Sequence, residues 1–105
     1  MNIEFDKKHL DLLNIPVVIT DYRGIIGYSN PAQSKLTGFS FAEIIDSRPG
    51  DLWGGQMLAS YYSKMWETIG SGKEYRDVVV NQKKSGERYL DQLSITPIIT
   101  TDYNK

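Results

Sequence analysis

The chain of 105 residues is long enough for one domain with a single modest core. Its net charge of -1 gives no basic surface of the kind that nucleic-acid-binding domains carry. The absence of cysteine excludes disulfides, thiol catalysis and cysteine-ligated zinc, and a single histidine, His9, excludes a multi-histidine metal site. No apolar run approaches the roughly eighteen residues that a membrane span needs, and no signal-peptide pattern is present. We therefore expect a protein of the cytoplasm.

Residues 1–14 are expected to form a short amphipathic helix that flanks the domain, and residues 15–105 are expected to form the domain itself. The flanking helix should end before Pro16, because the residue that precedes a proline is disfavoured in a helix. The β-branched run VVIT, the turn sequence DYRG and the run IIGYS then predict a hairpin over residues 17–29.

Capping residues mark two short helices after this hairpin. Asn30 is placed as an N-cap, Pro31 as the first helical residue and Gly38 as the terminator. Ser40, followed three residues later by Glu43, forms a capping box. The next stretch, DSRPGDLWGG, predicts a loop with one helical turn.

The segment 57–69 gives the clearest helical pattern, because its apolar residues recur at spacings of three and four. These residues are Met57, Leu58, Tyr61, Tyr62, Met65, Trp66 and Ile69. Such a stripe is most often core, but Met and Tyr side chains are also typical of a small-molecule cavity. Strand patterns over residues 74–82 and 88–99 flank the turn KKSGE. The complete order predicts an α+β fold, with helices over one face of an antiparallel sheet.

The last strand places a charge among apolar residues. Its alternation puts Tyr89, Asp91, Leu93 and Ile95 on one face, so a carboxylate stands in line with side chains that should be buried. No serine elbow, phosphate loop or metalloprotease motif accompanies it, and an enzyme is therefore the least supported class.

Two long stretches, VVITDYRGIIGYSNPAQSKLTGFSFAEII and WETIGSGKEYRDVVVNQKKSGERYLDQLSITPI, resemble the two halves of a PAS domain. The similarity covers about residues 12–101, and both halves match in order and spacing. In the first half it is carried by Thr20, Asp21, Gly24, Asn30, Pro31, Leu36, Thr37, Gly38, Ser40 and Glu43. In the second half it is carried by Trp66, Gly72, Lys84, Gly86, Tyr89 and Pro97.

The resemblance implies a five-stranded antiparallel sheet in the order 2-1-5-4-3. It also implies a sensing module rather than a catalyst, placed beside a histidine-kinase or diguanylate-cyclase output domain in a longer signalling protein. The sequence stops soon after the fourth strand. We therefore expect that the fifth strand is cut away, or that a partner strand or the N-terminal segment replaces it.

In flavin-binding relatives, two polar residues on the third and fourth strands point into the cofactor cavity, and their counterparts here are Asn81 and Asp91. The alternation agrees, since Val79 and Asn81 share a parity across the hairpin from Asp91 and Leu93. The prediction is a mostly apolar pocket in which these two polar side chains contact the ligand. Alternatively, Asp91 pairs with a nearby Arg or Lys, or a bulge turns it to solvent. The predicted ligand-binding residues are Trp53, Met57, Tyr61, Met65, Asn81, Asp91 and Leu93.

Departures from the family pattern limit the classes of ligand that we expect. Light-sensing flavin members carry a cysteine where this chain has Pro49, and haem-binding members supply a histidine from the long helix, which has none here. Neither a thiol-adduct flavin nor haem is expected, which leaves a small organic ligand or no ligand. Without a ligand the domain would serve dimerisation and signal relay, with Leu10, Leu12 and Leu13 of the flanking helix meeting a second copy. The expected assembly is a homodimer, without nucleic acid and without membrane insertion.

Overall fold

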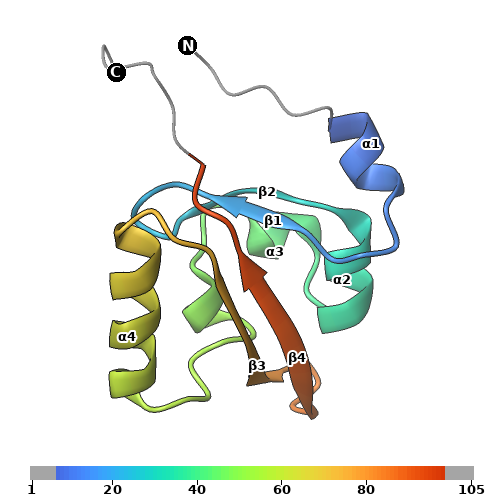
Figure 1. Ribbon diagram of the computed structural model, residues 1–105. Coiled ribbons are helices and arrows are strands. Elements are labelled where there is room, and N and C mark those ends of the chain that lie inside the picture. Colours follow the sequence, from blue (N-terminus) through green and yellow to red (C-terminus); the bar gives the residue numbers. More distant parts are fainter. Residues whose placement is uncertain (1–6, 99–105) are drawn as a thin grey trace.

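The computed structural model describes residues 7–98, and Figure 1 shows their helices and strands in chain order. The elements are α1 (Lys7–Leu12), β1 (Val18–Thr20), β2 (Ile26–Ser29), α2 (Pro31–Thr37), α3 (Phe41–Ile44), the 3-10 turn η1 (Pro49–Asp51), α4 (Ala59–Gly70), β3 (Tyr75–Gln82) and β4 (Arg88–Ile95). This is the predicted α+β order. Within these residues, none of the helices combines the length and the apolar character needed to cross a bilayer.

The β1–β2 hairpin is closed by the side chain of Asp21. Its carboxylate accepts hydrogen bonds from the backbone N–H groups of Arg23 at 2.8 Å and Ile25 at 3.0 Å. These bonds, with the Arg23 side chain, lower the pKa of Asp21 below its ordinary value. Gly24 takes a φ of 82°, a conformation that side chains rarely adopt. The turn predicted from DYRG is confirmed.

The caps of α2 and α3 are also confirmed. Asn30 accepts a hydrogen bond from the N–H of Gln33, and α2 ends at Gly38 with a φ of 84°. Ser40 and Glu43 exchange both bonds of the capping box. These interactions lie within a few residues of each other along the chain, which is why the sequence reveals them.

Asn30 does more than cap a helix. Its amide group donates to the carbonyl oxygens of Leu10 at 3.0 Å and Ile15 at 2.8 Å, and its side-chain oxygen also accepts the N–H of Val17 at 2.9 Å. The side chain is 1% exposed. It therefore ties the end of α1 and the start of β1 to the first turn of α2.

The core is small and centres on Ile26, Ile44 and Trp53. Phe39 packs on Trp53 with 6.5 Å between the ring centroids. Full burial of side chains of this size contributes about 1.5–3 kcal/mol each.

Helix α4 begins two residues later than predicted, and its apolar stripe is only partly buried. Leu58 precedes the helix with extended backbone angles and is 78% exposed, whereas Met65 is buried. Trp66 is 47% exposed, with its ring beside Gly24, where a Cβ atom would lie 3.5 Å from it. The wide buried stripe expected from the spacing is therefore wrong in extent: Met65 is the one buried residue of α4.

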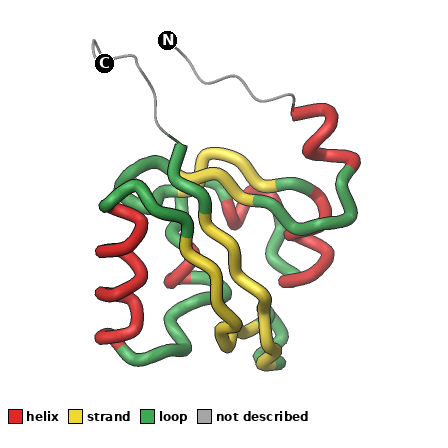
Figure 2. Tube along the Cα trace, viewed as in Figure 1, coloured by secondary structure: helices red, strands yellow, loops and turns green. Residues whose placement is uncertain are grey.

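The strands form two separate antiparallel pairs, β1–β2 and β3–β4 (Figure 2). Among residues 7–98 no strand lies between β1 and β4, which the order 2-1-5-4-3 would place on either side of a fifth strand. The expected single sheet is thus present as its two outer hairpins. The backbone N–H groups of Gln82 and Lys84 donate to the carbonyl oxygens of Trp53 and Thr37, each at 2.8 Å, so the turn end of β3–β4 is fixed to the helical half.

Candidate functional site

The inner face of the β3–β4 hairpin carries the odd-numbered residues, as predicted. Val79 is 3% exposed and Asn81 is 5% exposed. On β4 the odd residues are half-buried and the even residues are exposed, Leu90 to 73%. The register pairs Val79 with Asp91, so the strands meet without a bulge at this point.

Asn81 and Asp91 are joined directly. The side-chain nitrogen of Asn81 donates to a carboxylate oxygen of Asp91 at 2.9 Å. Burial raises the pKa of Asp91 above its ordinary value, and the bond from Asn81 only partly offsets that shift. Within the described residues, Asp91 forms no ion pair with Arg or Lys, and no bulge turns its carboxylate to solvent. The prediction that Asn81 and Asp91 share the inner face is confirmed, and the hydrogen bond between them was not predicted.

Tyr89 is a third polar group on this face, and it was not among the predicted ligand-binding residues. It pairs with Asn81 in the register, and its hydroxyl is buried without a hydrogen-bond partner in the described part of the chain. Burial and the negative charge of Asp91 raise its pKa. The Lys83 ammonium lies 5.9 Å from the centre of its ring. The odd number of Tyr89 could have indicated its role, because it places Tyr89 on the same face as Asp91.

Tyr61, which was predicted to line the ligand pocket, forms a polar contact that was not predicted. Its hydroxyl donates to a carboxylate oxygen of Asp77 at 2.8 Å, and the Tyr75 hydroxyl donates to the same oxygen at 3.3 Å. The bond from Tyr61 is the main reason that the pKa of Asp77 is lowered. The rings of Tyr61 and Tyr75 meet edge to face, 6.1 Å between centroids. This cluster attaches α4 to β3, and Asp77 was missed although it shares the parity of Asn81.

The other predicted residues fall in different environments. Trp53 and Met65 are buried, Trp53 within the core cluster. Met57 and Leu93 are half-buried. The backbone N–H of Met57 donates to the Tyr62 hydroxyl at 3.2 Å.

Of the predicted residues, Asp91 lines a hollow in the described structure. That hollow has a volume of about 680 Å³ and lies against α1, α2 and the segment that joins α1 to β1. Its apolar lining comes from Leu12, Leu13, Pro16, Pro31, Ala32 and Leu36. Asp91, but not Asn81, therefore borders an open space on the side of α1. Residues 7–98 contain no group of three or more His, Cys, Asp or Glu side chains that could hold a metal ion.

Comparison with known proteins identifies the family. A family model described as a PAS domain matches residues 14–105. Nitrogen fixation regulatory proteins of Klebsiella oxytoca and Klebsiella pneumoniae are each 33% identical over 86 residues, which is 82% of this chain. The chain spans 17% of the length of either relative.

Solved structures show the same fold. The PAS domain of a protein from Colwellia psychrerythraea superposes with a TM-score of 0.82 at 20% identity, over 92% of this chain and 82% of that chain. An RNA-binding Light-Oxygen-Voltage receptor superposes with a TM-score of 0.83 at 17% identity, over 90% of this chain and 28% of that chain. The chain belongs to the PAS domain family, whose members are sensory and regulatory modules of signalling proteins.

Proposed function

We propose that this PAS domain senses a small organic ligand held at the inner face of β3–β4, and relays its presence to an output domain of a longer cytoplasmic protein. The observation that carries the proposal is the contact between Asn81 and Asp91, at 2.9 Å on a face that is otherwise mostly apolar. A half-buried carboxylate with one amide partner retains lone pairs that a ligand donor can fill.

The polar groups of this face suggest what the ligand carries. Asp91 as an anion only accepts hydrogen bonds, whereas the Tyr89 hydroxyl can donate or accept. A ligand with a donor for Asp91 and an acceptor for Tyr89 would satisfy both groups. The chain has no cysteine, so it cannot form a thiol adduct with a flavin. Neither haem nor a photochemical flavin is part of the proposal.

The relay is proposed to run through α1. The hollow that Asp91 lines is also lined by Leu12 and Leu13, so a molecule bound there would touch both the hairpin and the flanking segment. A ligand shifts a signalling equilibrium only by binding one arrangement of the domain more tightly than another. Asn30 fixes α1 in the present arrangement, and a ligand that displaces α1 would work against those bonds.

Native mass spectrometry of the freshly purified protein tests the proposal. We expect a non-covalent mass adduct that is absent under denaturing conditions, and we expect Asp91→Leu to lose it. Gln92→Leu is the matched control, because Gln92 is the next residue of the same strand and is exposed on the outer face. Far-UV circular dichroism shows whether each variant is folded. Equal ligand occupancy in the folded Asp91→Leu variant and the wild type would remove Asp91 from the site.

A ligand-free dimerisation module is the second candidate, and exposed apolar residues favour it. Leu12 is 79% exposed, Ile15 is 68% exposed and Leu90 is 73% exposed. The outer face of β3–β4 and the flanking segment therefore present apolar surface that a second copy could cover. Of the residues predicted for contact between copies, Leu10 is half-buried against the domain, whereas Leu12 and Leu13 are exposed.

Sedimentation analysis separates the two candidates. The dimerisation module is supported if the wild-type protein is a dimer without a bound ligand and the Leu12→Glu variant is a monomer. A monomer that carries a ligand supports the sensor. Tyr22→Glu is the control for added charge, because Tyr22 is 92% exposed in the β1–β2 turn.

A further inference from the structure

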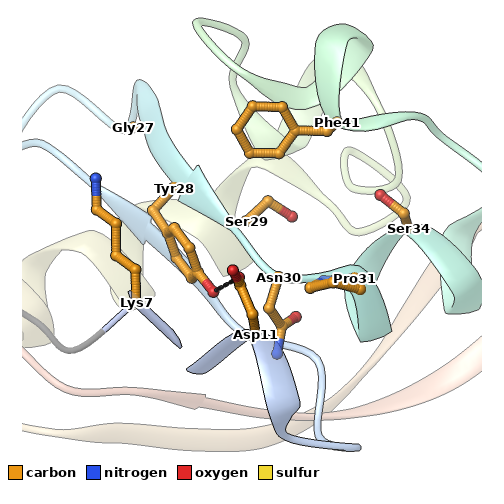
Figure 3. Close-up of a pocket in the computed structure, with 9 residues that line it drawn as sticks. All are labelled: Lys7, Asp11, Gly27, Tyr28, Ser29, Asn30, Pro31, Ser34 and Phe41. Carbon is orange, nitrogen blue, oxygen red and sulfur yellow. Dashed lines mark hydrogen bonds between the residues drawn. The ribbon is translucent and has the colours of Figure 1, made fainter. Parts of the chain in front are cut away.

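A second hollow lies between α1, β2 and the first residues of α2 and α3 (Figure 3). Its volume is about 530 Å³, which is within the range of small-molecule sites. It shares Asp11 and Pro31 with the hollow that Asp91 lines, but neither Asn81 nor Asp91 borders it. Neither the family resemblance nor the proposed sensor function makes use of it.

Ser29 supplies the observation that points to a ligand. The residue is 2% exposed, and its hydroxyl has no hydrogen-bond partner within residues 7–98. A buried hydroxyl without a partner costs free energy, so such groups are rare unless something else satisfies them. In Figure 3 this hydroxyl points toward the side of the hollow where Phe41 and Ser34 lie. The Ser34 hydroxyl also turns toward that space, so two neutral polar groups converge below the Phe41 ring.

The remaining lining defines the character of a ligand. Phe41 is 55% exposed although it is the first residue of α3, and it offers an uncovered ring face. Lys7 and Asp11 contribute one positive and one negative charge, and Asp11 already accepts the Tyr28 hydroxyl at 2.5 Å. Because these charges cancel, the hollow has no net attraction for an ion. An aromatic ring and two hydroxyls suit a flat molecule with its own donor and acceptor.

We propose that this hollow binds a neutral, planar aromatic molecule, which stacks on Phe41 and exchanges hydrogen bonds with the hydroxyls of Ser29 and Ser34. A primary aromatic amide has this chemistry, since its carbonyl accepts and its NH₂ group donates. Gly27 leaves room for the molecule at the β2 strand, because a Cβ atom built there meets nothing within 4 Å.

Titration of the isotopically labelled protein with benzamide, followed by amide NMR shifts, tests the proposal. We expect saturable shifts at Gly27, Ser29, Ser34 and Phe41, with millimolar affinity. Ser29→Ala should weaken binding about three- to tenfold, which corresponds to the loss of one neutral hydrogen bond. Ser94→Ala is the matched control, because Ser94 is exposed on β4 and should leave the affinity unchanged.

A second variant and a second ligand complete the test. Gly27→Val should abolish the shifts while preserving the fold, because its side chain enters open space and Gly27 does not have a positive φ. Benzoate should bind more weakly than benzamide. The inference is overturned if benzamide gives no saturable shift, if Gly27→Val or Ser29→Ala binds as well as the wild type, or if benzoate binds more tightly. Shifts confined to Asn81 and Asp91 would also overturn it, and would instead support the sensor site on β3–β4.

Discussion

Replacing Asn30 with alanine removes a side chain that holds four backbone groups. The lost acceptor serves the N–H groups of Val17 and Gln33, and the lost donor serves the carbonyl oxygens of Leu10 and Ile15. The side chain is 1% exposed, so water cannot replace it without local rearrangement. The substitution therefore acts at the junction of α1, β1 and α2.

The expected loss of stability follows from these four bonds. The N-cap to Gln33 is worth about 1 kcal/mol. The other three are neutral hydrogen bonds worth about 1 kcal/mol each when both partners stay buried. Since α1 is mostly exposed, water can reach the Leu10 and Ile15 carbonyls once the helix moves, and this reduces the cost. We expect Asn30→Ala to lower the free energy of unfolding by about 2–4 kcal/mol.

Urea denaturation followed by far-UV circular dichroism measures this loss. Asn30→Ser is the matched variant: serine can still cap α2 at Gln33 but cannot reach α1, so it should retain about 1 kcal/mol relative to alanine. Hydrogen exchange of the α1 peptide should become faster in both variants. A loss below about 1 kcal/mol for Asn30→Ala, or identical losses for the two variants, would refute the assignment of Asn30 as the tether of α1.

Three further predictions concern the hairpins. We expect the Asp91→Asn variant to be more stable than the wild type at pH 7, because the folded-state pKa of Asp91 is raised and its ionisation opposes folding. The difference in Tm between the two proteins should shrink as the pH falls to the ordinary carboxyl range. A difference that grows at low pH would contradict this prediction. Tyr61→Phe should raise the pKa of Asp77 toward its ordinary value, as followed by carboxyl-carbon NMR; an unchanged pKa would contradict the bond. Gly24→Ala should destabilise the domain by about 1 kcal/mol, since alanine is strained at positive φ, whereas Gly27→Ala should not; urea denaturation compares the two, and equal stabilities would argue against the turn geometry.

The parts of the fold that the sequence predicts are those set by neighbours along the chain. The Asp21 turn and the caps at Asn30 and Ser40 depend on residues two to four positions apart, and each was assigned to its residue. The parity of β3–β4 was predicted for the same reason, because alternation is a local property of a strand. It placed Asn81 and Asp91 on the same face, whereas the hydrogen bond between them is seen only in the structure.

Interactions between distant segments could not be read in this way. The helical spacing of α4 indicated which residues share a face, but it could not show that Tyr61 meets Asp77. Nor could it show that Leu58 lies outside the helix, because a two-residue shift of a helix start leaves the periodicity intact. The second use of Asn30, as a donor to α1, is likewise invisible in a motif that already explains the residue as a cap.

The way the β3–β4 hairpin is anchored determines how a change at Asp91 can be transmitted. Near the turn the hairpin is held by backbone bonds from Gln82 and Lys84, and the Lys84 ammonium also pairs with Glu43 at 2.8 Å. Asn81 lies next to this fixed end, so this part of the hairpin cannot move readily when a ligand binds Asp91. The hollow that Asp91 lines is also lined by α1, which is exposed and is attached through Asn30 and through the Tyr28 hydroxyl that donates to Asp11. Because the less constrained wall moves at lower cost, we expect α1 rather than the hairpin to respond to occupancy at Asp91.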